Sequence, residues 1–154
     1  MPLDKIPRVG IGVLLLKEKG REVLLGKKIG SQGANTWAPP GGEKRYQERA
    51  ADAALRILME SIGFSRENVE LIDKRPVNPP TEDFFINGPD YTTLWIRARY
   101  IQGDTRVIKP EEHETWGLFR WGSGLPNPLF LPLSNLIKME FNPYNGSENG
   151  RNWW

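Results

Sequence analysis

The sequence predicts an α+β fold in which a mixed β-sheet lies between helices, an α/β/α arrangement. Strand-like segments precede and follow two helical segments, and the first helical segment carries an apolar stripe that must pack on a core. No repeat, linker or low-complexity block divides the 154 residues, a length that suits one domain. We therefore expect a single domain over residues 1–154, with its core at about residues 7–145 and a loose C-terminal tail.

The first two strands are predicted to form a hairpin. Residues 8–16 are apolar and β-branched with small residues between them, which suits a central strand that its neighbours approach closely. A charged turn at residues 17–21 contains a glycine and leads to a second strand at residues 22–29. A glycine-containing loop at residues 30–33 follows.

A helix is predicted in the segment between Gly42 and Gly63. This segment is a run of good helix formers, and Gly63 is a natural C-terminal stop. One face carries an apolar stripe that must pack on the core, formed by Ala51, Leu55, Leu58 and Ile62. Another face carries a charged row that by itself is typical of a solvated helix surface, formed by Glu48, Asp52, Arg56 and Glu60.

The second half of the chain is predicted to complete the sheet and add a last helix. Residues 69–77 indicate a strand that Pro76 places at an edge or a bulge. Residues 78–89, rich in Pro, Asn and Asp, indicate a long loop with an apolar tip at Phe84-Phe85-Ile86. Two more strands at 91–101 and 115–121 precede a helix at 129–139, which tolerates Pro132 in its first turn; no periodic pattern follows Tyr144.

Composition excludes several functional classes. The 21 basic and 19 acidic residues give a net charge of +2, which is not the clustered charge of a nucleic-acid binder. Cysteine is absent, so a disulfide framework, a thiolate nucleophile and a Cys-ligated zinc site are excluded. The chain start lacks an apolar signal core, and no apolar run approaches the ~20 residues that span a bilayer. We expect a cytoplasmic protein that binds neither nucleic acid nor membrane.

The segment from Gly42 to Phe64 resembles the Nudix box, Gly-x5-Glu-x7-Arg-Glu-U-x-Glu-Glu-x-Gly-U, in which U is bulky and apolar. Seven of the nine defined positions match: Gly42, Glu48, Arg56, Leu58, Glu60, Gly63 and Phe64. Flanking segments resemble the MutT-like branch and plant cytosolic Nudix hydrolases, namely residues 33–42, 110–116, 128–133 and 141–143. The resemblance covers roughly residues 7–145 and implies the Nudix fold, a small-molecule diphosphate substrate, and a homodimer as the common state of relatives.

The two mismatches fall at positions that carry the family's metal chemistry. In the family, the Glu after the Arg and the second Glu of the pair bind Mg²⁺ or steer the attacking water; here these positions are Ile57 and Ser61. Mg²⁺ takes oxygen ligands, so Ile57 cannot replace a carboxylate and a serine hydroxyl does so poorly. The resemblance leaves Glu60 as a metal ligand and catalytic residue, with Glu43 and Glu114 as further candidate ligands and Glu114 as a second catalytic candidate.

The remaining site residues divide into a scaffold and a pocket. By resemblance, the structural positions of the box are Gly42, Glu48, Arg56 and Gly63, with Glu48 and Arg56 joined by an ion pair. The side chains predicted to meet substrate are Trp37, Phe84, Asp90, Tyr91, Trp95, Trp116 and Phe130, with Phe85 and Leu131 as further candidate walls. Aromatic residues at strand spacing are more often core, and such a pocket suits a stacked base or a buried prenyl chain equally.

Other polar residues have ordinary alternatives as well. His113 is the sole histidine and the one imidazole that can act as a general base, although a lone histidine beside several glutamates is more often a surface residue. The nearest approach to a basic patch is Lys27-Lys28 with Lys44-Arg45, which flanks the predicted diphosphate pocket and is either solvated surface or a phosphate attractant.

Three functions follow from the degenerate box. The first is a weak or residual Mg²⁺-dependent diphosphohydrolase acting on a nucleoside or prenyl diphosphate. The second is a repurposed, metal-independent acid/base enzyme, an isomerase or cyclase, in which Glu60, Glu114 or Asp90 acts on a small organic molecule. The third is a binding protein without catalysis. The losses at Ile57 and Ser61 favour the last two, and the intact surroundings favour the first.

Overall fold

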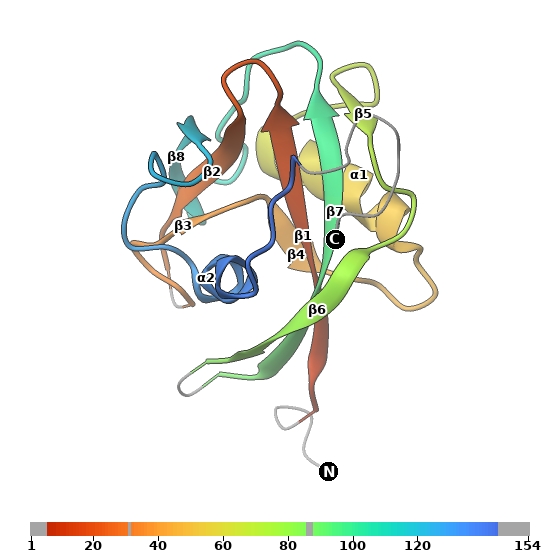
Figure 1. Ribbon diagram of the computed structural model, residues 1–154. Helices are drawn as coiled ribbons and strands as arrows, with labels where there is room; N and C mark the ends of the chain where they lie inside the picture. Colours follow the sequence, from red (N-terminus) through yellow and green to blue (C-terminus); the bar gives the residue numbers. More distant parts are fainter. Residues whose placement is uncertain (1–5, 31, 86–87, 145–154) are drawn as a thin grey trace.

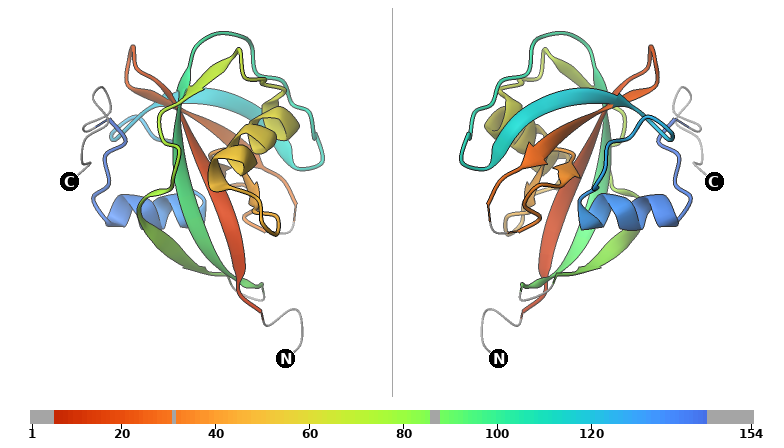
Figure 2. Two further views of the ribbon diagram at one scale, coloured as in Figure 1. Left: turned by 90° about the vertical axis from the view of Figure 1, so that its right-hand side faces the viewer. Right: turned by 90° about the vertical axis from the view of Figure 1, so that its left-hand side faces the viewer.

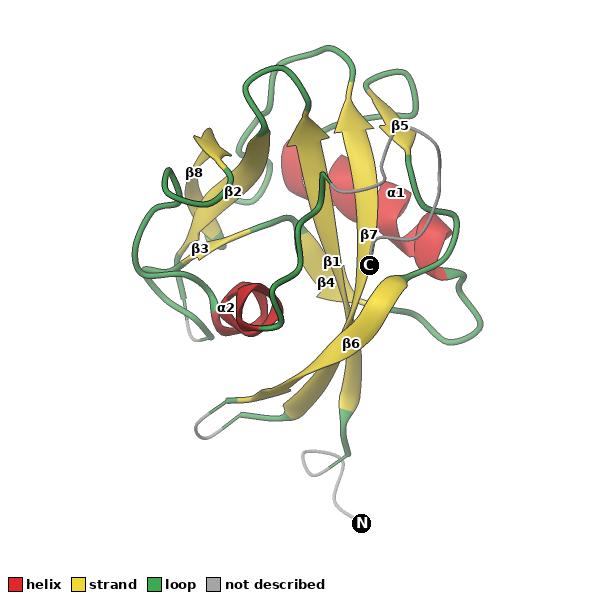
Figure 3. Cartoon of the chain, in the orientation of Figure 1, coloured by secondary structure: helices red, strands yellow, loops and turns green. Residues whose placement is uncertain are grey.

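The computed structural model describes residues 6–30, 32–85 and 88–144 and confirms a mixed sheet between helices (Figure 1). In chain order the elements are β1 (Arg8–Lys17), β2 (Glu22–Lys28), β3 (Trp37–Ala38), β4 (Gly41–Glu43), α1 (Ala50–Ile62), β5 (Val69–Leu71), β6 (Val77–Phe84), β7 (Asp90–Tyr100), β8 (His113–Arg120) and α2 (Leu131–Lys138). Strands predominate, and Figure 3 shows that the two helices lie apart from each other.

Strand β1 is the centre of the sheet. It runs parallel to β7, with residues 8–16 opposite residues 91–99, and antiparallel to β2 and β4. The strand order is β3-β2-β1-β7-β5, while β6 pairs with β7 and β8 pairs with β2. Residues 10–16 of β1 are all buried, as expected for a strand that is covered on both faces.

Each face of the sheet has its own core, and one helix covers each (Figure 2). Helix α1 packs against the first face through Ala53, Ala54, Ile57, Leu58 and Ile62. Helix α2 packs against the second face through Leu133 and Leu136, together with Phe141 and Tyr144 beyond it. Alternate residues of β1 point to opposite faces, so Val13 and Leu15 join the first core while Leu14 and Leu16 join the second.

Two glycines of the first hairpin leave room for tryptophan side chains that pack against the backbone. Gly12 lies opposite Trp95 in the β1–β7 register, and a Cβ at Gly12 would lie 2.4 Å from a carbon of the Trp95 ring. Likewise, a Cβ at Gly26 would lie 2.6 Å from the Trp116 ring. The glycines of the hairpin therefore allow neighbouring side chains to pack directly against its backbone, as the sequence predicts.

The prediction of a loop at residues 78–89 is wrong over its first part. Residues 77–84 form β6, which pairs antiparallel with β7. Proline cannot donate to a sheet ladder and occurs at bulges, and the β6 register shifts between Val77 and Thr81, the stretch that contains both prolines. The polar Asp83 is buried and accepts hydrogen bonds, so it does not mark a loop here. The tip residue Ile86 lies outside the described residues.

Several element boundaries also differ from prediction. Residues 41–43 form β4, so the helix begins at Ala50; it ends at Gly63, whose φ of 76° suits glycine. The predicted strand at 69–77 stops at Leu71, where the Asp73 carboxylate turns to bond Arg97 of β7. Strand β8 starts earlier than predicted, and α2 is shorter by a few residues. The predicted tail lies outside the described residues.

No helix within the described ranges has the length and apolar character needed to cross a membrane.

We predict that Gly12→Ala lowers the free energy of unfolding by about 1–3 kcal/mol, because the new methyl overlaps the Trp95 ring and overpacks the core. Urea unfolding followed by tryptophan fluorescence measures the change. Gly10→Ala is the matched control on the same strand, because its nearest new contact is 3.4 Å to the Tyr91 ring. Equal effects of the two substitutions would contradict the close-packing explanation.

Candidate functional site

Arg56 joins the segments on both sides of α1's first turn. Its Nε donates to Glu48 Oε2 and its Nη2 to Glu48 Oε1, both at 2.9 Å, in a bidentate pair. Nη2 also donates to the Glu43 carbonyl at 2.9 Å, and Nη1 donates to Glu60 Oε1 at 2.9 Å. One guanidinium therefore holds the strand β4, the turn before the helix and the helix itself in a single arrangement.

The Glu48–Arg56 pair is well shielded from solvent. The two side chains are 14% and 19% exposed. The hydrogen bonds from Arg56, then the backbone N–H of Arg45, lower the pKa of Glu48 from its usual 4.5 to about 2, against the opposing effect of burial. The same carboxylate raises the pKa of Arg56. Both groups are charged across the neutral pH range.

At the two positions where the resemblance implies carboxylates, the chain has Ile57 and Ser61. Ile57 is 2% exposed and belongs to the first core, and a Cβ at Gly42 would lie 3.4 Å from its Cγ1, so its side chain sits beneath the loop. Glu60 is bonded by Arg56 and lies 3.6 Å from Arg45. Within the described residues no group of three or more His, Asp or Glu side chains is placed to hold a metal ion.

A charged depression lies beside the second half of α1, and we call it the basic depression. It is lined by five cations, three carboxylates and five other residues. The cations are Lys28, Lys44, Arg45, Arg56 and Lys109, the carboxylates are Glu43, Glu60 and Glu112, and the others are Gly41, Gly42, Ile57, Ser61 and His113. The excess of cations gives it a positive charge. The donor set fits Mg²⁺ only if a bound phosphate supplies oxygens in place of the carboxylates that are missing at positions 57 and 61.

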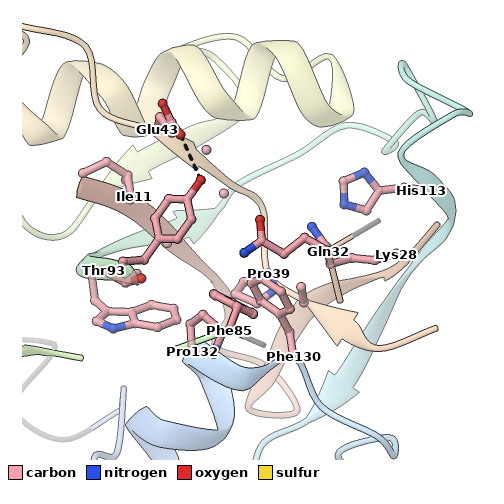
Figure 4. Close-up of a pocket in the computed structure, with 17 residues that line it drawn as sticks. Ile11, Lys28, Gln32, Pro39, Glu43, Phe85, Thr93, His113, Phe130 and Pro132 are labelled. Atoms are coloured by element: carbon pink, nitrogen blue, oxygen red, sulfur yellow. Dashed lines mark hydrogen bonds between the residues drawn. The ribbon is translucent and has the colours of Figure 1, made fainter. Parts of the chain in front are cut away.

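A second hollow, the aromatic pocket, adjoins the basic depression and encloses about 170 Å³ (Figure 4). Its walls come from β1, β4, β7, the loop after β2 and the start of α2, and they include Ile11, Gly12, Lys28, Gln32, Pro39, Gly42, Glu43, Phe85, Tyr91, Thr93, Trp95, His113, Phe130 and Pro132. The two hollows share Lys28, Gly41, Gly42, Glu43 and His113. A ligand with an aromatic part and a charged part can therefore occupy both.

Glu43 stands at the junction of the two hollows. Its Oε1 accepts hydrogen bonds from Arg8 Nη1 at 2.8 Å and from the Tyr91 hydroxyl at 2.9 Å. The bond from Arg8 is the main reason that the Glu43 pKa lies below its usual value. Burial first, and then the neighbouring Glu43, raise the pKa of Tyr91. Glu43 is thus an oriented carboxylate with one oxygen engaged.

Lys28 and His113 stand on the opposite side of the junction. Lys28 Nζ lies 4.6 Å from the centroid of the Phe130 ring, and burial lowers its pKa. Burial, then the positive charges of Lys28 and Lys109, lower the pKa of His113 to about 4. The imidazole is therefore neutral at pH 7, and its ring centroid lies 4.4 Å from that of Trp116.

The structure brings only part of the predicted substrate set together. Tyr91, Trp95 and Phe130 line the aromatic pocket, as does the candidate wall Phe85. Five predicted site residues do not line either hollow: Trp37, Phe84, Asp90, Glu114 and Trp116. The sequence named both members of three neighbouring pairs, and one member of each pair lines a hollow: Phe85, Tyr91 and His113 do, whereas Phe84, Asp90 and Glu114 do not. Adjacent residues of an extended chain point to opposite faces, so one residue of each pair is turned away.

These five residues have other contacts or face solvent. Trp37 packs edge-on against Phe119 at 5.0 Å, and Trp116 packs over Gly26. Phe84 is 65% exposed. Asp90 is exposed at the start of β7, and the Glu114 carboxylate lies 3.5 Å from Lys27 Nζ on the surface.

Two polar residues of the aromatic pocket were not predicted. Thr93, on β7, has its hydroxyl buried beside Trp95, and Gln32 reaches in from the loop after β2. The Gln32 Nε2 is buried and has no hydrogen-bond partner among the described residues. The sequence places Gln32 in a loop beside Gly33, which gave no indication that its amide is buried.

Comparison with known proteins agrees with this architecture. A family model described as NUDIX domain matches residues 6–129. An RNA pyrophosphohydrolase from Cereibacter sphaeroides is 29% identical over 128 residues, covering 78% of each chain. Nudix hydrolase 6 of Arabidopsis thaliana is 27% identical over 106 residues, which cover 64% of this chain and 38% of that protein.

Solved structures resemble the whole fold. A MutT NUDIX hydrolase from Burkholderia pseudomallei superposes with a TM-score of 0.70 and 27% identity, covering 88% of this chain and 98% of that one. The NUDIX domain of Shewanella oneidensis NrtR, complexed with ADP ribose, has a TM-score of 0.65 at 16% identity and covers 88% of this chain and 86% of that one. At that identity the second likeness concerns the fold alone.

We predict that Glu48→Gln lowers the free energy of unfolding by about 2 kcal/mol at pH 7, because it leaves the shielded Arg56 without its bidentate partner. The Glu48 pKa is depressed in the folded state, so its contribution is present above pH 4.5 and is lost as the pH falls toward about 2. Urea unfolding at several pH values measures the difference between wild type and variant.

Glu67→Gln is the matched control, because Glu67 is an exposed glutamate just beyond the same helix. A Glu48→Gln deficit that stays constant from pH 7 to pH 3 would contradict the ion-pair explanation.

Proposed function

We propose that this chain, which belongs to the NUDIX domain family, is a Mg²⁺-dependent diphosphohydrolase of reduced activity on a small nucleoside or prenyl diphosphate. The observation that carries the proposal is the junction of the two hollows, where Glu43 and Glu60 line a cation-rich depression that opens into an aromatic pocket. A diphosphate with an attached planar or apolar group has the shape and charge to occupy both.

The charges of the basic depression favour a phosphate ligand. Five cations face three carboxylates there, and Lys28 is partly desolvated, so a phosphate would relieve mutual repulsion among the cations. Arginine and lysine donors fit phosphate oxygens through charge-assisted hydrogen bonds. Arg45 and Lys44, which follow β4, and Lys109, which precedes β8, reach the depression from different segments.

The metal would be shared between the protein and its ligand. When bound, Mg²⁺ neutralises charge on the leaving phosphate and lowers the pKa of a water. Glu60 is the one box carboxylate retained at a metal position, and Glu43 has a second oxygen without a hydrogen bond to Arg8 or Tyr91. Mg²⁺ is commonly held by one or two carboxylates plus substrate phosphates, which is the set available here.

Acid/base chemistry without a metal has less support. A general base works best with a pKa near the operating pH, whereas the His113 pKa is about 4. Of the three carboxylates named for that chemistry, Asp90 and Glu114 do not line either hollow, and Glu60 lines the basic depression with one oxygen bonded by Arg56.

A binding protein without catalysis is the second candidate. It is favoured by one observation: the Ile57 side chain, 2% exposed, is an integral part of the core at a position where the family pattern has a metal ligand. Packing there stabilises the fold, and the same packing removes an oxygen donor from the depression.

We predict that millimolar Mg²⁺ raises the melting temperature by several degrees in the presence of ADP or geranyl diphosphate, because a ligand that binds only the folded state stabilises it by mass action. Glu60→Gln should abolish the Mg²⁺-dependent part of this shift. Differential scanning fluorimetry measures it, and Glu67→Gln, outside both hollows, should keep the full shift.

The same samples assayed for phosphate release separate the two candidate functions. Release that requires Mg²⁺ supports the hydrolase, and a shift without release supports the binding protein. If no diphosphate shifts the melting temperature with or without Mg²⁺, both candidates fail.

We predict that restoring both carboxylates, Ile57→Glu with Ser61→Glu, raises the hydrolysis rate at least about tenfold, because the missing elements are oxygen ligands. Without metal the double variant should be about 2 kcal/mol less stable than wild type, since the carboxylate introduced at position 57 would be buried, and Mg²⁺ should restore that loss. The two substitutions should be non-additive because they share one metal site.

Met59→Glu is the matched control, because Met59 lies on the same helix but is 48% exposed and does not line the basic depression. A double variant that folds and binds Mg²⁺ yet leaves nucleotide and prenyl diphosphates intact would favour the binding protein.

A further inference from the structure

We infer that Thr93 and Gln32 determine which ring the aromatic pocket accepts, and that the buried Asp83 fixes the hydrogen-bonding polarity of Thr93. The ligand implied is a planar heterocycle that presents an N–H donor to Thr93 and an acceptor to Gln32. This inference rests on the proposed function in one respect, namely that the diphosphate of the same ligand lies in the basic depression.

Asp83 is fully buried and receives three hydrogen bonds. Its Oδ2 accepts from the Thr93 hydroxyl at 2.7 Å and from the Thr81 hydroxyl at 3.2 Å, and its Oδ1 accepts from Asn135 Nδ2 at 2.8 Å. A carboxylate accepts hydrogen bonds and has no hydrogen to donate, so both threonine hydrogens are committed to it. The network joins β6, β7 and α2.

This commitment leaves the two threonine oxygens as acceptors. Thr81 Oγ1 already accepts the indole N–H of Trp95 at 3.2 Å. Thr93 Oγ1 has no donor among the described residues, and Thr93 lines the aromatic pocket (Figure 4). Because its hydrogen points to Asp83, Thr93 offers the pocket a lone pair and cannot reverse its polarity.

Gln32 provides the complementary group. Its Nε2 is buried without an acceptor among the described residues, and Figure 4 shows the amide turned into the pocket. A buried donor without a partner is costly, so a ligand that brings an acceptor to Gln32 gains more than a solvent-exposed hydrogen bond would provide. The pocket thus presents an acceptor at Thr93, whose polarity Asp83 fixes, and an unpaired amide N–H at Gln32.

Aromatic side chains among the other walls favour a flat ring. Phe85 and Phe130 lie 5.5 Å apart with their planes tilted by 31°, and Tyr91 meets Phe85 edge-on at 6.0 Å. A prenyl chain would leave the Gln32 donor and the Thr93 acceptor unpaired. A heterocycle with N–H and C=O or ring-nitrogen groups, such as a nucleobase, satisfies both, and this separates the two ligand classes that the sequence leaves equal.

The test is isothermal titration calorimetry on the full chain with Mg²⁺ and non-hydrolysable α,β-methylene diphosphates. Adenosine is paired with purine riboside, which lacks the exocyclic amino donor, and uridine with 3-methyluridine, which lacks the ring N–H. Geranyl diphosphate and methylenediphosphonate complete the set. In at least one pair we expect the donor-bearing ligand to bind about tenfold more tightly, the loss typical of one hydrogen bond to a buried acceptor.

Variants then test whether Thr93 causes the difference in affinity between the donor-bearing ligand and its partner. Thr93→Val, nearly the same shape without the acceptor, should weaken the donor-bearing ligand about tenfold and leave its partner within about twofold. Thr92→Val on the same strand is the matched control, because its side chain points to the opposite face. Asp83→Asn should also reduce the difference in affinity between the two ligands of a pair. The introduced amide can donate a hydrogen bond to the Thr93 oxygen, which leaves the Thr93 hydroxyl hydrogen free to point into the pocket.

Gln32→Leu should weaken every ring-bearing ligand about tenfold and leave methylenediphosphonate unchanged. Equal binding within both pairs, tighter binding of geranyl diphosphate, or discrimination that survives Thr93→Val would each overturn the inference. If one of these outcomes is found but methylenediphosphonate still binds, the inference about Thr93 and Gln32 fails while the proposed function stands. If no diphosphate binds at all, the proposed function fails and the inference fails with it.

Discussion

The parallel pairing of β1 with β7 is the constraint on which the rest of the structure depends. Its register sets Gly12 opposite Trp95, and only a residue without a side chain leaves room for that indole. The same two strands supply both cores through their alternate residues, and they also supply the floor of the aromatic pocket. Stability and binding therefore share one pair of strands, so a change in register would disrupt both.

Arg56 holds the box segment in its conformation through bonds that do not involve positions 57 and 61. Its bonds to Glu48, Glu60 and the Glu43 carbonyl hold the loop, the strand and the helix together without any metal. Ile57 and Ser61 take no part in those bonds, and Ile57 adds apolar packing beneath the loop. The ion-pair cluster therefore holds this scaffold independently of the residue types at positions 57 and 61.

Two hollows of different character meet at Glu43, Lys28 and His113. The basic depression is lined by more cations than carboxylates, and the aromatic pocket surrounds a few polar groups with aromatic side chains. Burial explains why Lys28 and His113 have lowered pKa values and why His113 is neutral at pH 7. The buried Asp83 network behind the pocket connects β6, β7 and α2, so the walls and their polarity are fixed together.

The sequence by itself determined the box, the helix end at Gly63, the hairpin and the two-sided apolar pattern of β1, because these depend on local spacing and on chain chirality. The sequence did not determine which of two neighbouring residues faces the pocket: Phe85 and Tyr91 line it, whereas Phe84 and Asp90 do not. Only the tertiary structure decided these, together with the burial of Asp83 and Gln32 and the strand at residues 77–84. The physical reason is that a strand's facing and a polar group's burial depend on partners distant in the sequence, and a shift of one residue exchanges the two faces.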